Sequence, residues 1–513
     1  MKLKAVRIKN FRGYKDAGWI EIGNMTGFVG KNDSGKSTIL EALDLFFDQS
    51  RKLEAADFRK GCCDLDKVEI SCAFSQLPNK VVLDESSETT LKDEYLTNDV
   101  DELVITKKYT PNQRAEVLVR GKHPINLPCA DLLRAKDSKL RALIEKNDIP
   151  CDDKTSNVAM RKAIRNFFNS SLQVEEIEIS MKADMVDRLH KYLPRYYLFK
   201  ADRENTEDDI AVRKPITDEI VQLIDGDNEL AEHLNFVAQR ILSSLSDLMR
   251  RALEKLNEVD IPLTCNLQPS LPNIGKLKWA DVFKDVTLIG DDEIPMEKRG
   301  SGVRRLVLLS FLRAAKELGI DKSKSLIYAI EEPETAQHSD NQRKLMQTLH
   351  KVATSEGFQV IVTTHSASVA KEIGISKIRI VDKKEVSTKV EIAKSFLNER
   401  LSKSLNFVAY TVFGDCSMEY HNELYGYIEA HGQMKACGNE YVAKYGERLW
   451  KRIKNKKDIE EDKSLCYYVR NSIHHPENTK NTPPTDKEVR ESIAFMENFI
   501  NRHKKEFGKG AGK

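Results

Sequence analysis

Residues 30–38 constrain the fold of this chain more than any other stretch, and they read Gly-Lys-Asn-Asp-Ser-Gly-Lys-Ser-Thr. They match the pattern G-x-x-x-x-G-K-[ST], which a chain of this length would contain by chance on the order of 0.02 times. An apolar segment, residues 25–29, precedes them, and residues 39–46 carry apolar side chains at helical spacing. The sequence therefore predicts a strand, a glycine-rich loop and a helix in an α/β domain.

A loop of this kind binds phosphate groups. Glycines let the backbone wrap closely around an anion, and successive N–H groups at a helix N-terminus supply positive potential. Lys36 would reach the β- and γ-phosphates of a nucleotide, and the Ser37 hydroxyl would bind Mg²⁺. ATP and Mg²⁺ are therefore the expected cofactors. The candidate nucleotide-binding residues of the loop are Gly30, Asn32, Ser34, Gly35, Lys36, Ser37 and Thr38.

Two later segments end in residues suited to the same chemistry. Residues 325–330 are an apolar run followed by Glu331 and Glu332, as expected for a buried parallel strand whose carboxyl end faces a ligand. Glu331 would complete the Mg²⁺ coordination, and Glu332 would polarise the attacking water during ATP hydrolysis. Residues 358–364 form a second apolar run, which ends at His365.

Residues 8–13, Ile-Lys-Asn-Phe-Arg-Gly, together with the glycine-rich loop, resemble the opening of SMC-like and RecF/OLD-like ABC ATPases. The resemblance implies an α/β fold in which an ABC-ATPase head is formed from the N- and C-terminal halves of the chain. It also implies that Arg12 approaches the nucleotide phosphates. In the same way it implies that His365 is the switch histidine, which hydrogen-bonds the γ-phosphate.

Residues 299–306, Arg-Gly-Ser-Gly-Val-Arg-Arg-Leu, precede a predicted helix at 308–315 and resemble the signature motif of OLD-like members. Small residues at a helix N-terminus suit a γ-phosphate, although Gly-Ser-Gly by itself would only cap a helix. In ABC ATPases that phosphate belongs to the other protomer. The resemblance therefore implies a head-to-tail homodimer in which Ser301 and Gly302 contact ATP held by the second copy.

Composition limits the other function classes. The 513 residues carry a net charge of only +2, so the whole chain is not a basic nucleic-acid-binding surface. Nine cysteines without a C-x-x-C pair favour reduced thiols over a disulfide or zinc framework. No apolar run is long enough to span a membrane, and no apolar segment follows the basic N-terminus as in a signal peptide. We expect a cytoplasmic protein.

The pattern of apolar residues predicts four parts. Helical spacing dominates the second part without a strict heptad, which favours a compact helical insertion over a long coiled-coil arm. The parts are an N-terminal lobe of the head (1–76), a mainly helical insertion with some strands (77–290), a C-terminal lobe of the head (291–395) and a helical C-terminal domain (400–513).

The C-terminal domain contains the segment 465–478, which includes Arg470-Asn471-Ser472-Ile473-His474-His475-Pro476. Arg470 and His475 fit the Arg-then-His spacing of HEPN-type ribonucleases. In that interpretation, arginine holds the scissile phosphate of an RNA such as tRNA while histidine transfers protons. A helix stopped by Pro476 would leave both histidines at its C-terminal end, where the helix dipole favours the protonated ring.

A second interpretation comes from the whole chain, which resembles the PtuA-type ATPase subunits of Septu anti-phage systems. There the nuclease is a separate HNH protein of PtuB type, and the C-terminal domain would dock a partner. Septu-like modules also occur in retrons, where a reverse transcriptase and its msDNA would be partners. A DNA-repair ATPase of RecF type and a purely structural Arg–His pair stay open. The strand–Glu–Gly and Asp-x-Asp elements of a Toprim nuclease do not follow residue 381.

Overall fold

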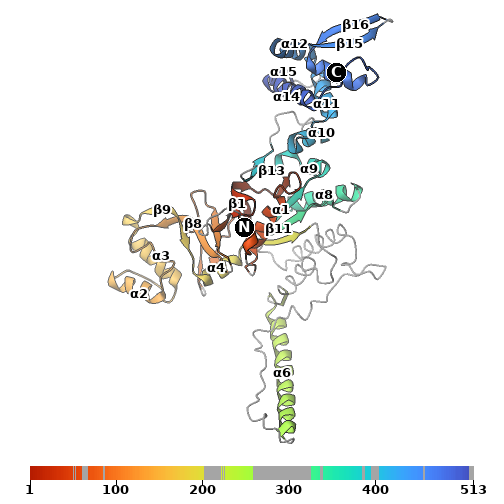
Figure 1. The fold of residues 1–513 in the computed structure, drawn as a ribbon. Coiled ribbons are helices and arrows are strands. Elements are labelled where there is room, and N and C mark those ends of the chain that lie inside the picture. Colours follow the sequence, from red (N-terminus) through yellow and green to blue (C-terminus); the bar gives the residue numbers. More distant parts are fainter. Residues whose placement is uncertain are drawn as a thin grey trace. The chain divides into compact units, whose positions relative to one another are not determined.

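The structure is a computed structural model. It describes residues 1–49, 51, 53–59, 67–84, 87–111, 113–200, 221, 223–224, 226–257, 325–335, 339–383, 387–393, 404–454 and 457–507. Two compact units divide the chain: Met1–Leu198 with Ser325–Lys513, and Phe199–Lys324 (Figure 1).

The first unit contains a six-stranded antiparallel sheet in the order β2-β1-β4-β7-β8-β9. The outer strands expose charged side chains on one face, whereas the central strands β4 and β7 are buried along most of their length. The strands are β1 (Lys2–Phe11), β2 (Tyr14–Glu21), β4 (Val68–Ser75), β7 (Leu103–Tyr109), β8 (Glu116–Pro124) and β9 (Val174–Ser180).

A second six-stranded sheet has the order β10-β11-β12-β3-β13-β14. Strands β11, β12, β3 and β13 are parallel, and β14 is antiparallel to β13. Because β3 lies between two strands from the distant C-terminal part, the predicted α/β head formed from both ends of the chain is confirmed. The strands are β3 (Met25–Val29), β10 (Arg195–Phe199), β11 (Leu326–Glu331), β12 (Phe358–Thr364), β13 (Ile378–Lys383) and β14 (Thr388–Ile392).

Helix α1 (Lys36–Phe47) joins the two sheets, since it contacts β1 and β4 of one and β12 of the other (Figure 1). Its buried face contributes Ile39, Leu43 and Phe46 to one large core shared with both sheets. The buried Gln359 side chain fastens the sheets directly. It accepts a hydrogen bond from the Leu3 N–H and donates to the Leu3 carbonyl, each at 2.8 Å.

The remaining elements of the head are short or lie on its outside. They are the helices α8 (Ser339–Thr354) and α9 (Ala367–Ile373), the strands β5 (Val81–Val82) and β6 (Glu88–Thr89), and the 3-10 turns at Ala55–Asp57, Asn169–Ser171 and Ile375–Lys377.

The structure divides the chain differently from the predicted boundaries. Strands β7, β8 and β9 continue the sheet begun by β1 and β4, so a boundary after residue 76 would cut one sheet in two. Strands β7 and β8 form a hairpin, but β7 pairs with β4 and β9 pairs with β8 across long stretches of sequence, which local spacing does not reveal. The separate unit is instead Phe199–Lys324, whose described part is mainly α6 (Asn228–Asn257).

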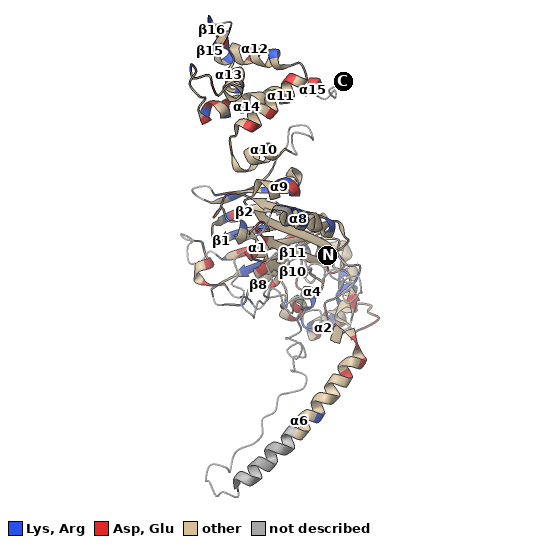
Figure 2. Cartoon of the chain, turned by 90° about the vertical axis from the view of Figure 1, so that its right-hand side faces the viewer, with Lys and Arg blue, Asp and Glu red and all other residues tan. Residues whose placement is uncertain are grey.

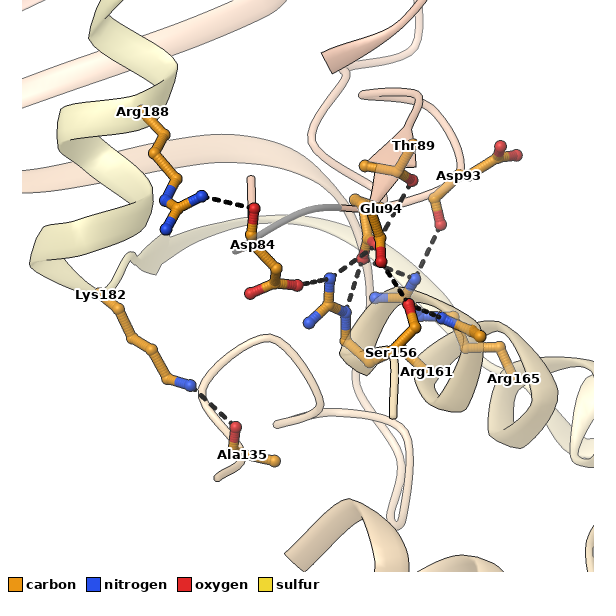
Figure 3. A network of polar contacts seen from close by, with 12 residues as sticks. Asp84, Thr89, Asp93, Glu94, Ala135, Ser156, Arg161, Arg165, Lys182 and Arg188 are labelled. Carbon is orange, nitrogen blue, oxygen red and sulfur yellow. Dashed lines mark hydrogen bonds and ion pairs between the residues drawn. The ribbon is translucent and has the colours of Figure 1, made fainter. Parts of the chain in front are cut away.

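A small helical subdomain, α2 (Asp137–Lys146) and α3 (Asn157–Phe167), lies between β8 and β9 in the sequence and has its own apolar core. An ion-pair network connects it to the segments around Asp84 and Glu94, which precede β7 in the sequence (Figure 3). The buried Arg161 pairs with Glu94 at 2.9 Å and with Asp84 at 2.6 Å, and Arg165 pairs with Glu94 at 2.9 Å. Arg188 of α4 (Ala183–His190) donates to the Asp84 carbonyl.

Burial alone would raise the pKa of Glu94, but the charges of Arg161 and Arg165 outweigh it and lower that pKa. The carboxylate is therefore kept ionised although it is only 1% exposed. Removing one member of such a group leaves the others charged and buried, which costs more than the intact network contributes.

The C-terminal region is mainly helical, as predicted, and adds one β-hairpin. Helix α11 begins at Met418, because Ser417 caps it by accepting from the Tyr420 N–H. The elements are α10 (Leu405–Val408), a π-helical turn (Ala409–Phe413), α11 (Met418–Ala430), α12 (Met434–Tyr445), β15 (Arg448–Lys454), β16 (Lys457–Lys463), α13 (Leu465–His474), α14 (Asp486–Arg502) and α15 (Lys504–Phe507). Within the described ranges, the helices are too short or too polar to cross a membrane.

We expect Glu94→Gln to destabilise the α2–α3 subdomain by about 3–5 kcal/mol, because it leaves Arg165 and part of Arg161 buried without a counter-charge. Hydrogen exchange of the α3 amides under native conditions measures this directly. Asp137→Asn is the matched control, since it removes an exposed i,i+4 pair with Arg141, which is worth about 0.3–0.5 kcal/mol. Equal exchange in both variants would contradict the prediction.

Candidate nucleotide site

The glycine-rich loop follows β3 at the carboxyl edge of the parallel strands, and its shape requires its glycines. A Cβ on Gly30 would lie 2.3 Å from the Val381 carbonyl oxygen and 2.9 Å from Ser34 Oγ. Gly35 precedes α1 with φ 102°, a left-handed conformation that other residues rarely adopt. The predicted order of strand, loop and helix is confirmed.

Lys36 lies folded across this loop. Its ammonium donates to the carbonyls of Gly30, at 3.0 Å, and Lys31, at 2.9 Å. Burial lowers the pKa of Lys36, and the nearby negative charges of Glu332 and Glu334 partly oppose that effect. A phosphate group in the loop would supply the missing counter-charge at close range.

The other loop residues present polar groups around Lys36. Ser34 Oγ is buried and has no hydrogen-bond partner among the described residues, so its hydroxyl is available to a ligand. Ser37 and Asn32 are exposed, and Thr38 is half-buried. Tyr14, which is fully buried, donates to the Gly35 carbonyl at 3.0 Å and so supports the loop from the antiparallel sheet.

The acidic residues lie at the end of β11, next to β12. Glu331 is buried and pairs in register with Thr363. Glu332 leaves the strand with φ 40°, an uncommon conformation for a residue with a side chain, and its N–H donates to the Thr363 carbonyl at 2.9 Å. This strained turn directs the chain away from the sheet immediately after the buried carboxylate.

His365 faces two carboxylates. Its Nδ1 atom lies 3.2 Å from Glu332 Oε1 and 3.4 Å from Glu334 Oε1. Glu334 Oε1 also accepts hydrogen bonds from Thr364 Oγ1, at 2.5 Å, and from the His365 N–H, at 3.1 Å. Glu334 therefore fixes the position of the loop that carries the histidine.

Sequence reasoning did not select Glu334 as a site residue. Its signal was its place in the Glu-Glu-Pro-Glu turn, where Pro333 reverses the chain so that the last glutamate returns toward the neighbouring strand. The Glu334 side chain is 8% exposed and the Glu332 side chain is 27% exposed. Glu334 therefore contacts His365 from the buried side and Glu332 contacts it from the more accessible side.

Arg12 is held by two carboxylates beside α1. It forms ion pairs with Asp57, at 2.8 Å, and with Glu41 of α1. Burial would lower its pKa, but these two partners raise it. Glu41 is one helical turn beyond Ser37, so the structure places Arg12 along the side of α1, and contact with phosphate stays a prediction. Ser301 and Gly302 of the predicted signature motif lie outside the described residues.

The residues predicted to hold Mg²⁺ fit that ion. Mg²⁺ takes one or two protein oxygens and completes its octahedral coordination with water and phosphate. Ser37 offers an exposed hydroxyl at the start of α1, and Glu331 offers a buried carboxylate at the end of a strand of the same sheet. The described part of the chain contains no cluster of three or more His, Cys, Asp and Glu side chains suited to a metal.

Arg470 and His475 in the C-terminal region have separate partners. The Arg470 guanidinium donates to Asn471 Oδ1 at 3.1 Å and lies 5.6 Å from the centre of the Tyr425 ring. His475 Nδ1 is 3.2 Å from Glu477 Oε1, and the His475 side chain is 52% exposed. Helix α13 ends one residue before His475, where the sequence predicted a stop.

Comparison with known families gives one match that covers most of the chain, since residues 1–370 match the AAA ATPase domain family. The chain belongs to this family. The matched range includes the glycine-rich loop and all four residues that meet at the edge of the parallel strands: Lys36, Glu332, Glu334 and His365. A comparison with curated proteins gave no match.

Several solved structures are also similar to this AAA ATPase chain. An SMC head bound to the C-terminal winged-helix domain of ScpA is 14% identical, with 76% of this chain and 97% of that one covered and a TM-score of 0.37. The SMC head domain from Thermotoga maritima is 12% identical over 77% and 100%, with a TM-score of 0.32. An SMC head with an extended coiled coil, bound to the ScpA C-terminal domain from Pyrococcus furiosus, is 12% identical over 76% and 96%, with a TM-score of 0.36.

We expect Gly30→Ala to weaken ATP binding at least about tenfold, because the new methyl group would overlap the Val381 carbonyl and overpacking costs about 1–3 kcal/mol. Titration with a fluorescent ATP analogue measures the effect. Gly426→Ala in α11 is the control, since its Cβ would meet open space. Unchanged affinity in Gly30→Ala would show that the loop does not form the binding site.

Proposed function

We propose that this AAA ATPase chain binds and hydrolyses ATP with Mg²⁺ as an ABC-type head. One observation carries the proposal: Lys36 of the glycine-rich loop, the Glu332–Glu334 pair and His365 meet at the carboxyl ends of adjacent parallel strands. A cation for phosphate and a carboxylate for water activation are the two groups that phosphoryl transfer to water needs from a protein.

Each residue then has one role. Lys36 would leave its two carbonyl partners and bind the β- and γ-phosphates, while Ser34 and the loop N–H groups hold the remaining oxygens. Ser37 and Glu331 would hold Mg²⁺, which would supply positive charge beside the phosphate groups. Glu332 would accept a proton from the attacking water.

His365 would bind the γ-phosphate and report its presence. In the structure its imidazole contacts Glu332 and Glu334, so a phosphate that takes over this histidine would change the environment of the catalytic carboxylate. Glu334, which holds the His365 N–H, would keep the histidine within reach in both states. This couples the nucleotide state to the position of one loop.

The proposal includes a second copy of the chain. By resemblance to ABC ATPases, Ser301 and Gly302 of one protomer would contact the γ-phosphate bound by its partner in a head-to-tail homodimer. ATP would then be enclosed between the two heads. Hydrolysis would release them.

We expect Glu332→Gln to reduce phosphate release by about 10²-fold or more while ATP still binds, because the variant keeps the shape of the side chain but not the base. Steady-state phosphate release and nucleotide titration on the full chain separate the two effects. Glu356→Gln, an exposed carboxylate just before β12, is the control. Wild-type turnover in Glu332→Gln would assign water activation to another group.

The biological role that we propose is anti-phage defence of Septu type in the cytoplasm, with the nucleotide state regulating an HNH nuclease of PtuB type. It rests on the resemblance of the whole chain and of its C-terminal segment. The separate partners of Arg470 and His475 support a docking domain over a paired catalytic site. Within a retron, the reverse transcriptase and msDNA would join the complex. DNA-repair work of RecF type would instead require hydrolysis stimulated by duplex DNA without a nuclease partner.

An active ribonuclease is the second candidate, because His475 is exposed directly after the end of α13 and follows Arg470 at the HEPN-type spacing. HEPN chemistry needs no metal. If the docking role is correct, we expect the purified chain to leave tRNA intact in EDTA, with or without ATP.

An Arg470→Ala/His475→Ala double variant is the control for that assay. Cleavage by the wild type that disappears in the double variant would move the nuclease into this chain and contradict the docking role. Cleavage that persists in the double variant would identify a contaminating ribonuclease.

A further inference from the structure

Strand β9 forms one edge of the antiparallel sheet. At the opposite edge another segment meets the start of β2, since Thr388 of β14 donates its N–H to the carbonyl of Gly13, just before β2, at 3.1 Å and the Lys15 N–H donates to Ser387 Oγ at 3.0 Å. Strand β9 pairs with β8 on one side only. An exposed edge presents unpaired N–H and C=O groups to which another strand can add.

The register shows which groups of β9 point outward. The Ile125 N–H donates to the Gln173 carbonyl, and the Met181 N–H donates to the Val117 carbonyl. In an antiparallel ladder every second residue bonds its neighbour, so Glu175, Ile177 and Ile179 face β8. The residues between them therefore direct their backbone N–H and C=O groups away from the sheet. These are Val174, Glu176, Glu178 and Ser180.

The open part of the edge is five residues long. Arg134 Nε donates to the Ser180 carbonyl at 3.0 Å and closes that end. From Val174 to Glu178, the outward backbone groups have no hydrogen-bond partner among the described residues. A length of about 17 Å, at roughly 3.4 Å per residue, suits a short added strand.

Charge indicates what kind of strand would fit. The solvent face of the sheet carries a row of alternating charges in which Lys9 pairs with Glu69, Glu69 with Lys108, and Lys108 with Glu178, at 3.3–3.5 Å. Figure 2 shows Lys and Arg interspersed with Asp and Glu around β1 and β8. Glu176 of β9 likewise pairs with Arg120 of β8 at 2.6 Å, so both glutamates end a row of paired charges and the next strand would continue the alternation with a cation.

The other features of the edge are apolar. Ile177 and Ile179 lie on the inner face of β9, and Ile179 packs against the main core. Large apolar side chains are also exposed where β8 and β9 end together: Ile125 is 37%, Leu127 79% and Val174 38% exposed. A strand with apolar residues on its inner face would extend this surface.

A second copy of the chain does not suit this edge. Pairing β9 with another β9 would place Glu176 and Glu178 of both copies near each other, and like charges on neighbouring strands are destabilising. Acidic residues on this edge therefore disfavour the pairing of two β9 strands. They leave the edge open to a basic strand.

We propose that β9 is a docking site for an extended segment of another protein, which adds a strand with Lys or Arg on its solvent face and apolar residues on its inner face. Backbone hydrogen bonds to Val174, Glu176 and Glu178 would give affinity, and the two glutamates would select basic side chains. This docking site lies outside the nucleotide site and does not depend on ATP hydrolysis.

The test uses the full chain and a seven-residue peptide of alternating Lys and Val, with an alternating Glu–Val peptide as the control. Site-resolved hydrogen exchange should show the Lys–Val peptide protecting the amides of Glu176 and Glu178, whereas Glu175 and Ile177 are already protected by β8. The Glu–Val peptide should protect none of them. Absence of added protection at millimolar Lys–Val peptide would overturn the proposal.

Two variants test the geometry and the charge. Glu176→Pro removes an outward N–H without breaking a bond to β8, so it should fold normally, keep its ATP turnover and bind the peptide about tenfold more weakly. Glu176→Gln should weaken binding about threefold, and Glu175→Gln, on the other face, should leave it unchanged. Equal binding by Glu176→Pro and the wild type would also overturn the proposal. Peptide-independent dimers that Glu176→Pro abolishes would assign the edge to a second copy instead.

Discussion

The insertion of β3 between β12 and β13 is the constraint on which the rest of this structure depends. It places a strand that ends at Val29 beside strands that begin at Phe358 and Ile378. Since the strands are parallel, their carboxyl ends lie at one edge of the sheet, and the glycine-rich loop meets the turns that carry Glu332 and His365. The strand order therefore assembles the site, because the N-terminal part of the chain supplies Lys36 and the C-terminal part supplies Glu332 and His365.

The buried charge of Lys36 and the unusual backbone conformation of Glu332 are both maintained by the groups around them. Lys36 is buried with a lowered pKa, and its ammonium is satisfied by two carbonyls of its own loop. Glu332 adopts a positive φ that the parallel strands around it maintain. A bound anion would give the Lys36 ammonium a counter-charge that the loop carbonyls do not supply. Binding a nucleotide would therefore lower the free energy of the buried ammonium.

Much of the head was predictable because its signals are local. The phosphate loop, the two apolar strands and their terminal Glu332 and His365 could all be found from short patterns, and the structure brings them together as expected. The antiparallel sheet was harder, since β9 joins β8 across about 50 residues and nothing local reveals the pairing. The partners of Arg12 depend on side-chain contacts that spacing does not encode, whereas Glu334 had a local signal in the Glu-Glu-Pro-Glu turn. The predicted signature at Ser301 lies outside the described residues.

The same strand order has a consequence during protein synthesis. When the ribosome has made residues 1–198, β3 has left the exit tunnel without either of its neighbours, and both appear only after residue 358. At elongation rates of about 5–20 residues per second, the roughly 330 residues between the end of β3 at Val29 and the start of β12 at Phe358 take about 15–65 s to synthesise, and during that time β3 has no partner strand in its sheet. Such a strand favours binding by chaperones, and assembly of the head is then a late event that follows translation of nearly three-quarters of the chain.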